Sequence, residues 1–405
     1  MAKIGIDFSV QKKSGGAYQY CLSFLDVLME DDGNEYVVFN SSGERLPKKY
    51  LGKYKIVNAF ENKKKENIII TNIMEYGYRL LLFLRLSIFV DFLFRLRYHS
   101  ILKKIKKENL DLIIFPSQER YVAYVDVPRI TTIYDLEHRK HPEFPEVSSK
   151  GRWASREFFF KKICKRSKKI FVDSDIGKED VVHFYKCNSN DVIVLPYLPP
   201  NYLEENIKEE ESLEILKKFN LPSKFLFYPA QFWPHKNHMN LLTAIKLLRD
   251  GGTIVSIVLC GSKKKEWGEY DRVLKYIKDN QLDRQVFVLG YVENNEMSAL
   301  YKSCQAMVMP TFFGPTNIPV LEAWKMECPV LYSNIRGCRE QLGDAGLLID
   351  PRDPSNIAEN IKRIWIDSDL RNDLIMKGKH RLNLWTYEDF YAKIKHTTNI
   401  VIDEI

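Results

Sequence analysis

The segment MVMPTFFGPTNIPVLEAWKMECPV, residues 307–330, contains the change of pattern that decides the fold. An apolar run that ends at Pro310 predicts a buried strand, and the glycine, proline, threonine and asparagine residues after it predict a loop. The apolar spacing that follows predicts a helix carrying Glu322. Open α/β sheets hold phosphorylated ligands where strand, loop and helix N-terminus follow one another, with an acidic side chain free for ribose hydroxyls. Taken alone, the segment also fits an ordinary strand-to-helix connection with a solvated glutamate.

A second segment, FLFYPAQFWPHKN at residues 225–237, repeats the strand-to-helix pattern. Its aromatic start predicts a strand, and the leucine and isoleucine residues of 241–248 recur at helical spacing. Lys236 therefore stands where a strand gives way to a helix. A cation there can reach a diphosphate that helix-end amides also hold. A lone lysine is more often solvated, but the order of the two segments favours a binding role.

Buried runs alternate with polar, helix-periodic stretches around these segments, which predicts an α/β fold with a doubly wound parallel sheet. Further strands are expected at residues 254–261, 286–290, 306–309, 329–333 and 346–350, with helices at 355–367 and 371–381.

The amino-terminal half repeats this architecture with different polar residues. A strand at residues 3–8 and a helix at 17–29 are expected, so the Gly15-Gly16 turn lies at a helix N-terminus where a phosphate can approach the backbone. Later strands are expected at residues 112–115, 129–133, 169–174 and 192–196.

The carboxyl-terminal segments resemble the donor-binding signature of the family 4 retaining glycosyltransferases. Pro319 and Glu322 match it, whereas Gly314 stands where that family has a first glutamate. Many relatives also carry an arginine five or six positions before the lysine, where this chain has Gln231 and Ala230. The resemblance implies that Glu322 contacts the nucleotide ribose.

The same resemblance implies a set of donor-binding residues on the loops and helix starts of both halves. They are Gly15, Gly16, Lys236, Asn237, Gly314, Thr316, Asn317, Ile318 and Glu322. Lys236 would contact the diphosphate, and the loop around Thr316 would supply the sugar contacts.

The turn after residue 133 lies where the family places a His-Asp pair facing the reacting sugar. Tyr134 takes the histidine position, Asp135 matches, and His138 follows. Histidine can act as an acid or a base near neutral pH, whereas tyrosine does so poorly. The resemblance implies Asp135, His138 and Lys236 as catalytic candidates, with Tyr134 as a hydroxyl contact. A hydrogen-bonded structural histidine is an equal alternative for His138.

The length of 405 residues exceeds the roughly 250 to 300 at which one core usually splits, so two domains are expected. The boundary should lie in PYLPPNYLEENIKEEESL, residues 196–213, which joins prolines to an acidic run. The resemblance implies the GT-B fold, two facing Rossmann-like doubly wound domains with an interdomain cleft. We expect an acceptor-side domain of residues 1–200, joined by a carboxyl-terminal helix at 386–405, and a nucleotide-sugar-binding domain of residues 201–385.

Cysteine usage and charge limit the other classes. The seven cysteines are odd in number and lack CxxC spacing, which suggests neither a disulfide framework nor a zinc site. The chain opens directly into a strand without a signal peptide, so a cytoplasmic location is expected. Despite the net charge of +8, no RNA-module signature is present, and no nucleic acid is expected as a partner.

Residues 80–94 are apolar apart from Arg85, Ser87 and Asp91. The stretch is shorter and more charged than a spanning helix, which needs about 20 mostly apolar residues. Ser87, Asp91 and Arg95 recur every four residues and mark a polar stripe, and basic residues follow. One interpretation is a helix resting on an anionic inner leaflet. We favour the other, a helix packed against the first domain's sheet with a basic exposed end.

Two Asp-x-Asp strings, at residues 173–175 and 367–369, lie outside the signature loops and are discounted as metal sites. The resemblance thus implies a metal-independent, cofactor-free glycosyltransferase that moves a sugar from a nucleotide diphosphate donor, with retention. The acceptor would be a glycan or a polyprenyl-diphosphate-linked sugar of cell-surface polysaccharide synthesis. A GT-B sugar-nucleotide epimerase and a noncatalytic nucleotide-sugar-binding partner protein are the alternatives.

Overall fold

Runs of consecutive apolar residues form the strands of two parallel sheets. The computed structural model describes residues 1–58, 68–203, 207–263 and 266–405. β4 (Leu112–Phe115), β9 (Ile257–Cys260) and β11 (Ala306–Met309) are buried along their whole length. Burial of both faces is typical of parallel strands that helices cover on either side. The chain divides into two compact units, unit 1 with Met1–Leu198 and Tyr387–Ile405, and unit 2 with Pro199–Thr386.

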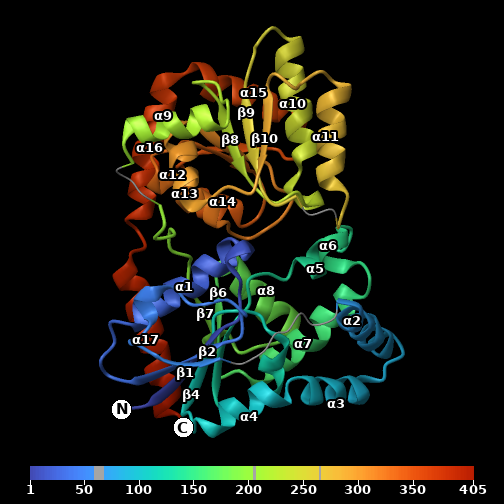
Figure 1. Ribbon diagram of the computed structural model, residues 1–405, viewed down its shortest axis with the longest axis vertical. Coiled ribbons are helices and arrows are strands. Elements are labelled where there is room, and N and C mark those ends of the chain that lie inside the picture. Colours follow the sequence, from blue (N-terminus) through green and yellow to red (C-terminus); the bar gives the residue numbers. More distant parts are fainter. Residues whose placement is uncertain (59–67, 204–206, 264–265) are drawn as a thin grey trace. The chain divides into compact units, whose positions relative to one another are not determined.

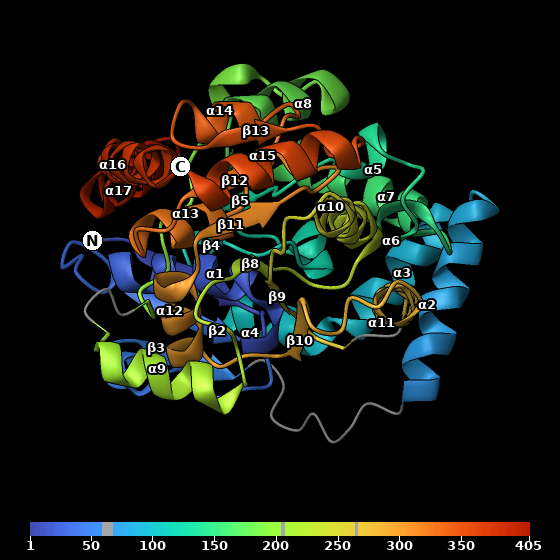
Figure 2. The same cartoon turned by 90° about the horizontal axis from the view of Figure 1, so that it is seen from above.

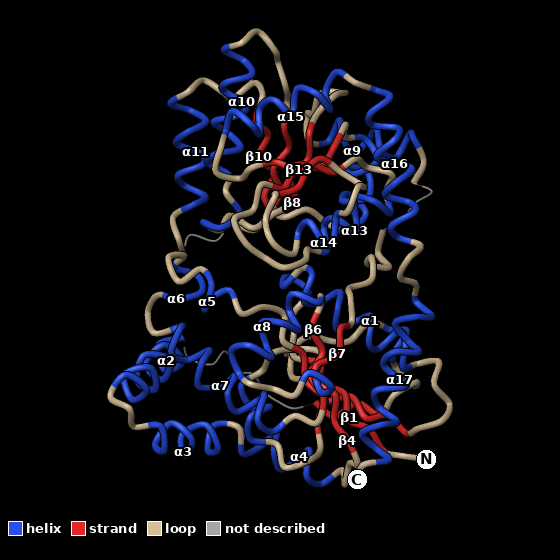
Figure 3. The backbone as a smooth tube through the Cα atoms, turned by 180° about the vertical axis from the view of Figure 1, so that it is seen from behind, coloured by secondary structure: helices blue, strands red, loops and turns tan. Residues whose placement is uncertain are grey.

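Unit 1 contains, among its described residues, a seven-stranded parallel sheet in the order β3-β2-β1-β4-β5-β6-β7. Its other strands are β1 (Lys3–Phe8), β2 (Glu35–Asn40), β3 (Lys55–Asn58), β5 (Arg129–Thr132), β6 (Lys169–Val172) and β7 (Val192–Val194). Its helices are α1 (Gly16–Leu28), α2 (Ile68–Phe83), α3 (Ser87–Arg97), α4 (His99–Lys107), α5 (Glu137–Lys140), α6 (Pro145–Ser148), α7 (Arg152–Arg166), α8 (Asp175–Tyr185) and α17 (Tyr387–Asp403). Figure 3 shows α1 and α17 on one side of this sheet and α2, α3 and α7 on the other.

Unit 2 contains a six-stranded parallel sheet in the order β10-β9-β8-β11-β12-β13, again counted over the described part of the chain. Its other strands are β8 (Leu226–Pro229), β10 (Val286–Gly290), β12 (Val330–Ser333) and β13 (Leu347–Ile349). Its helices are α9 (Glu209–Lys218), α10 (His238–Asp250), α11 (Glu269–Asp279), α12 (Asn294–Ser303), α13 (Ile318–Lys325), α14 (Cys338–Leu342), α15 (Pro354–Ile366) and α16 (Ser368–Leu382). Figure 2 shows α9, α12 and α13 on one side of the sheet and α10, α11 and α15 on the other. The expected doubly wound α/β architecture is confirmed.

The carboxyl-terminal helix α17 packs on α1 within unit 1. Phe390 is fully buried, and its ring meets those of Tyr20 and Phe24 edge-on, with centroids 6.3 and 5.4 Å away. Aromatic pairs in this geometry add to the stabilisation from buried area. α17 therefore covers the buried face of α1.

Several expected boundaries differ from the structure. β9 begins at Ile257 because Ile254 is exposed rather than part of the buried run. β2 and β3 were not expected. The other expected strands are found, with small differences at their ends.

The expectation of one helix across residues 80–94 is wrong. α2 ends at Phe83 and α3 begins at Ser87. Arg85 has a left-handed φ of 59°, its N–H donates to the carbonyl of Leu82, and the N–H of Leu86 donates to that of Leu81. These two bonds form a Schellman motif, which stops a helix by satisfying its last carbonyls. Among the described residues, no helix is long and apolar enough to cross a membrane.

Candidate functional site

The two segments singled out from the sequence meet at the switch point of the unit 2 sheet. β8 and β11 are neighbours in the sheet, with Leu226 opposite Ala306 and Phe227 opposite Met307. From β8 the strand order runs outward in one direction to β9 and β10, and from β11 in the other direction to β12 and β13. Ligands of open α/β sheets bind outside the carboxyl ends of the strands at such a point. The loops at residues 230–237 and 310–317 both leave from that edge.

His235 contacts the other loop in three ways. The backbone N–H of Phe312 donates to the carbonyl of His235 at 2.8 Å, and the Thr311 hydroxyl donates to the same oxygen at 3.2 Å. The ring of His235 stacks on that of Phe313, with centroids 4.0 Å apart. The loops are therefore fixed to each other, although about 75 residues separate them in the chain.

Lys236 stands at the end of a short 3₁₀ turn, Pro234–Lys236, immediately before α10. Its side chain is half-buried, and its ammonium donates to Oδ1 of Asn317 at 3.2 Å. Lys236 and Asn317, both expected to bind the donor, are thus brought together. A cation held at this edge is placed to meet a negative group.

Asn237 has a different part in the loop. Its left-handed φ of 58° makes the turn into α10, and its buried side-chain amide donates to the carbonyls of Pro310 at 2.8 Å and Pro351 at 2.6 Å. The amide hydrogens of Asn237 thus tie three segments of unit 2 together. These contacts show how the residue shapes the site, and its expected donor contact stays a prediction.

The signature loop is held from the side of α14. The N–H of Asn317 donates to Oε1 of Gln341, and the Gln341 amide donates back to the carbonyl of Asn317, both at 2.9 Å. The side-chain amide of Asn317 donates to the Tyr332 hydroxyl at 2.6 Å. Asn317 precedes Ile318, the first residue of α13. Ile318 is buried, and Thr316 is half-buried on the loop.

Gly314 has a φ of 119°, a conformation that L side chains rarely adopt. A side chain there would also begin 3.2 Å from the Asn317 amide. This backbone explains in physical terms why the chain carries glycine where the resembling signature has a glutamate.

Glu322 lies on α13, one turn after Ile318, and is 7% exposed. The hydroxyl of Tyr202 donates to one carboxylate oxygen at 2.8 Å, and that of Tyr301 to the other at 2.7 Å. Burial raises the pKa of Glu322, although both hydrogen bonds act in the opposite direction. The carboxylate is therefore held in one orientation. No pattern in the sequence pointed to either tyrosine.

The positions before Lys236 carry no cation. Oε1 of Gln231 accepts from the backbone N–H of Ser262 at 3.1 Å. Two arginines lie near the signature loop instead. Gly337 packs against the backbone of the loop, since an added Cβ would lie 2.3 Å from the carbonyl oxygen of Pro315. Arg336 directly precedes Gly337 and therefore lies beside the loop. The guanidinium of Arg352 lies 6.0 Å from the ring centroid of Phe312.

In unit 1, the glycine turn is open. Gly15 caps α1 with a φ of 61°, and an added Cβ would meet no atom within 4 Å. Gly16 is the first residue of the helix. The turn thus has both the backbone conformation and the free space that a close ligand approach requires.

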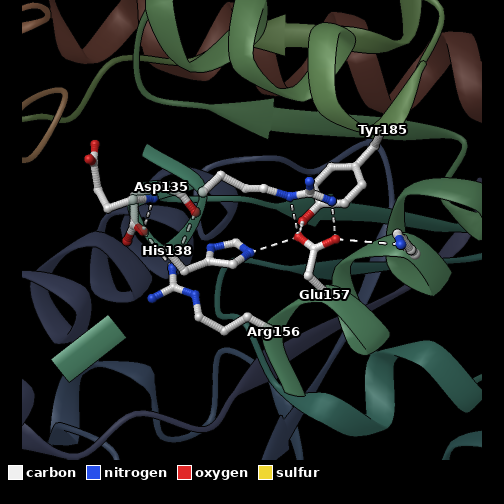
Figure 4. Close-up of polar contacts among 8 residues, drawn as sticks. Asp135, His138, Arg156, Glu157 and Tyr185 are labelled. Atoms are coloured by element: carbon white, nitrogen blue, oxygen red, sulfur yellow. Dashed lines mark hydrogen bonds and ion pairs between the residues drawn. The ribbon is translucent and has the colours of Figure 1, made fainter. Parts of the chain in front are cut away.

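The second polar cluster follows β5 (Figure 4). His138 is fully buried, and its Nε2 lies 2.9 Å from Oε1 of Glu157. Burial lowers the pKa of His138 below its ordinary value despite that carboxylate, so the imidazole is neutral at pH 7. Its other ring nitrogen is buried without a hydrogen-bond partner among the described residues. This environment fits the alternative of a hydrogen-bonded structural histidine, and a catalytic role stays a prediction.

Glu157 is the centre of that cluster. Besides His138, it accepts from Nε of Arg139 at 2.6 Å and from the Tyr185 hydroxyl at 2.8 Å. Burial alone would raise the pKa of Glu157, but these bonds outweigh it and lower the pKa to about 2. The charged carboxylate therefore fixes the turn that follows β5. Sequence reasoning missed this residue.

Asp135 and Tyr134 face other partners. Burial would raise the pKa of Asp135, but the guanidinium of Arg156 and the N–H of Glu137, 3.0 Å away, lower it. Asp135 is thus ionised and half-buried. The Tyr134 hydroxyl donates to the carbonyl of Pro116 at 2.6 Å.

The two Asp-x-Asp strings have capping roles. Ser174 caps α8 by accepting from the N–H of Gly177, and Asp367 caps α16 by accepting from that of Leu370. In the part of the chain that the structure describes, no group of three or more His, Cys, Asp or Glu side chains is arranged to hold a metal ion.

Replacing Glu157 with glutamine tests its role in stability. The folded pKa is lowered from 4.5 to about 2, so the stabilisation is complete above pH 4.5 and is lost as the pH falls through about 2. At pH 7, Glu157→Gln should lower the free energy of unfolding by about 3 to 5 kcal/mol, measured by urea denaturation. The difference from the unaltered protein should shrink between pH 4.5 and 2. Glu388→Gln, at an exposed position of α17, should change neither the free energy of unfolding nor its dependence on pH.

Comparisons with known proteins agree with this geometry. Residues 211–381 match the family described as "Glycosyl transferases group 1". The O-antigen chain mannosyltransferase B of Escherichia coli is 25% identical over 262 residues, which are 64% of this chain and 67% of that protein. The O-antigen chain mannosyltransferase RfbU of Salmonella typhimurium is 26% identical over 51% of this chain and 54% of its own. The chain spans only 27% of a third relative, the serotype-specific mannosyltransferase WbdA of Escherichia coli.

Solved structures share the fold of the whole chain. Anabaena Alr3699/HepE in complex with UDP-glucose aligns with a TM-score of 0.72 at 15% identity, over 98% of this chain and 100% of that one. WaaG, a glycosyltransferase involved in lipopolysaccharide biosynthesis, aligns with a TM-score of 0.69 at 14% identity, over 98% and 99% of the two chains. Residues 211–381 are thus similar to the group 1 glycosyl transferases, and the chain has the GT-B fold of the solved glycosyltransferase structures with which it aligns.

Proposed function

We propose that this glycosyltransferase moves a sugar from a nucleoside diphosphate sugar to a glycan or lipid-linked acceptor, with retention, in cell-surface polysaccharide synthesis. The observation that carries the proposal is the junction of the two loops at the switch point of the unit 2 sheet. There Lys236 and Asn317 are in contact, and α13 begins beside them. The names of the mannosyltransferase relatives and the UDP-glucose complex of a structural neighbour support the donor class and the pathway.

The donor's charges match the groups at this junction. The ammonium of Lys236 and the first amides of α13 would meet the diphosphate, since both favour negative charge. Glu322, whose orientation two tyrosines fix, would accept ribose hydroxyls with its remaining lone pairs. Arg336 and Arg352 are the candidates for a second cation. Diphosphate binding through cations and amides calls for neither a metal ion nor a cofactor.

Catalysis in this scheme is mainly charge stabilisation. As the bond from the sugar to the leaving diphosphate breaks, negative charge grows on the phosphate oxygens. Lys236 therefore binds the transition state more strongly than the intact donor. For retention, the acceptor oxygen would attack from the face that the diphosphate leaves, and the leaving phosphate would take the acceptor's proton. We assign no protein nucleophile, and Asp135 and the His138 turn are proposed to face the reacting sugar.

The acceptor completes the proposal. O-antigen relatives suggest a growing glycan, and a polyprenyl-diphosphate carrier is the lipid-linked form we propose. Such a carrier is embedded in a bilayer, so the enzyme would work in the cytoplasm at the inner face of that membrane.

Lys236→Met keeps the aliphatic stem and removes the charge. We expect kcat to fall by about tenfold or more beyond any loss of donor affinity, because the phosphate gains charge as the bond breaks. The measurement compares donor binding by calorimetry with product formation, using the sugar nucleotide that best raises the thermal stability of the protein.

Lys246→Met, which removes a half-buried α10 lysine paired with Asp250, is the matched control and should change neither donor affinity nor turnover. Equal losses of affinity and turnover would reduce Lys236 to a positioning group. No change in either would place the diphosphate elsewhere. Isomerised donor in a reaction without acceptor would indicate an epimerase instead.

Glu322→Gln separates ribose binding from a structural role. If Glu322 accepts ribose hydroxyls, the Kd for the nucleoside diphosphate should rise about 5- to 150-fold, which corresponds to about 1 to 3 kcal/mol. Tyr301→Phe removes one of the two hydrogen bonds that orient this carboxylate but no donor contact, so the Kd should rise less than in Glu322→Gln. An unchanged Kd for Glu322→Gln would make this residue a core carboxylate held by two tyrosines.

A further inference from the structure

α2 and α3 follow one another around a corner of unit 1 (Figure 1). Large apolar side chains of these two helices are exposed to solvent. Phe83 is 80% exposed, Ile88 74% and Phe92 61%. Single exposed apolar residues are ordinary on protein surfaces, but contiguous groups mark interaction sites. We call the exposed side chains of these two helices and their turn the α2–α3 corner. Its large apolar members are Met74, Tyr76, Leu80, Phe83, Leu84, Leu86, Ile88, Phe89, Phe92, Leu93 and Leu96.

α3 is apolar on both of its faces. Val90 and Phe94 are buried, and the ring of Phe94 lies 5.0 Å from that of Tyr78. This inward face is enough to attach the helix to unit 1. On the other face, Ile88 and Phe92 are four residues apart and therefore lie one turn above each other. The favoured expectation of a packed helix is thus correct for one face only.

Asp91, in the polar stripe of α3, contacts the rest of unit 1. One of its carboxylate oxygens accepts from the Tyr124 hydroxyl at 2.9 Å and pairs with the ammonium of Lys162. A surface helix of a globular protein normally turns its polar side to water and its apolar side to the core. On α3, Ser87 and Arg95 are exposed as expected, but large apolar residues are exposed beside them.

α2 contributes a second apolar row. Tyr76, Leu80, Phe83 and Leu84 are spaced by four, three and one residues, which places them on one side of the helix. The Schellman motif at Arg85 ends this helix, so the rows of α2 and α3 meet at the turn. The exposed apolar residues of the two helices therefore lie on either side of a single turn.

Basic side chains flank this surface. Arg85 in the turn is exposed, and so is Arg95 on α3, whose guanidinium lies 5.4 Å from the ring centroid of Tyr124. α4, which follows directly, exposes Lys103, Lys106 and Lys107. Apolar side chains bordered by arginine and lysine match the layers of an anionic bilayer, with acyl chains beneath negative headgroups.

We propose that the α2–α3 corner binds the surface of a membrane rich in anionic phospholipid. Its apolar residues would enter the headgroup region, and Arg85 and Arg95 would pair with lipid phosphates. A second copy of the chain is a poorer occupant, because a twofold contact on this corner would bring the same arginines of both copies together. The inference does not depend on the donor site, and it would bring a transferase to a lipid-linked acceptor.

Vesicle flotation tests the proposal. The protein should float with vesicles of phosphatidylcholine containing about 30% phosphatidylglycerol, and less with phosphatidylcholine alone, since the exposed basic residues are attracted to an anionic surface. The triple variant Phe83→Ser/Ile88→Ser/Phe92→Ser should bind about tenfold more weakly or worse, because its apolar groups no longer leave water. Arg85→Gln/Arg95→Gln should weaken binding to the anionic vesicles alone and reduce its dependence on salt.

The matched control Ile254→Ser/Ile366→Ser/Met376→Ser changes three similarly exposed residues of unit 2 and should bind as the unaltered protein does. Circular dichroism checks that every variant is folded. Absence of flotation of the unaltered protein, or equal flotation of the two triple variants, would overturn the proposal. So would a dimer that becomes a monomer in the Phe83/Ile88/Phe92 variant without any vesicle binding, because the corner would then be an interface between copies.

Discussion

The parallel pairing of β8 with β11 is the constraint on which the proposed site depends. It joins Leu226 to Ala306 across the sheet, although 80 residues of chain lie between them. Because parallel strands end at the same edge, the loops that follow must lie side by side. The hydrogen bond from Phe312 to the His235 carbonyl and the stacking of His235 on Phe313 then fix these loops to each other. Lys236, Asn317 and the start of α13 are together as a consequence.

Unit 1 has the same doubly wound architecture, and its polar cluster lies around the turn after β5. The turn after β5 is rigid because Glu157, charged and almost fully buried, accepts hydrogen bonds from His138, Arg139 and Tyr185. A buried charge is tolerated only when its partners satisfy it, and its loss leaves them unpaired. The neutral His138 is one of those partners, while the half-buried Asp135 keeps its charge through Arg156. Asp135 is therefore better placed than His138 to meet a substrate.

Strands and loops that depend on a local sequence pattern could be predicted. Buried strands such as β4 and β11 are continuous apolar runs, and the glycine and proline residues of 310–319 mark a loop whichever way the rest of the chain folds. Contacts between distant residues leave no such pattern. Tyr202 lies 120 residues from its partner Glu322, and Glu157 lies 19 residues from His138. The break at Arg85 was missed because the Schellman motif usually carries glycine at that position, and the apolar run continues through it.

Hydrogen exchange of the backbone amides, measured with and without a nucleoside diphosphate, locates the donor's diphosphate on the chain. The diphosphate is expected between the ends of β8 and β11. With UDP, and with the other nucleoside diphosphates in turn, the ligand that binds should slow exchange at residues 230–237 and 310–318, where the loops and the first amides of α13 lie. Protection confined to unit 1, or to the far side of the unit 2 sheet, with exchange in both loops unchanged, would show that the diphosphate does not bind at the ends of these strands.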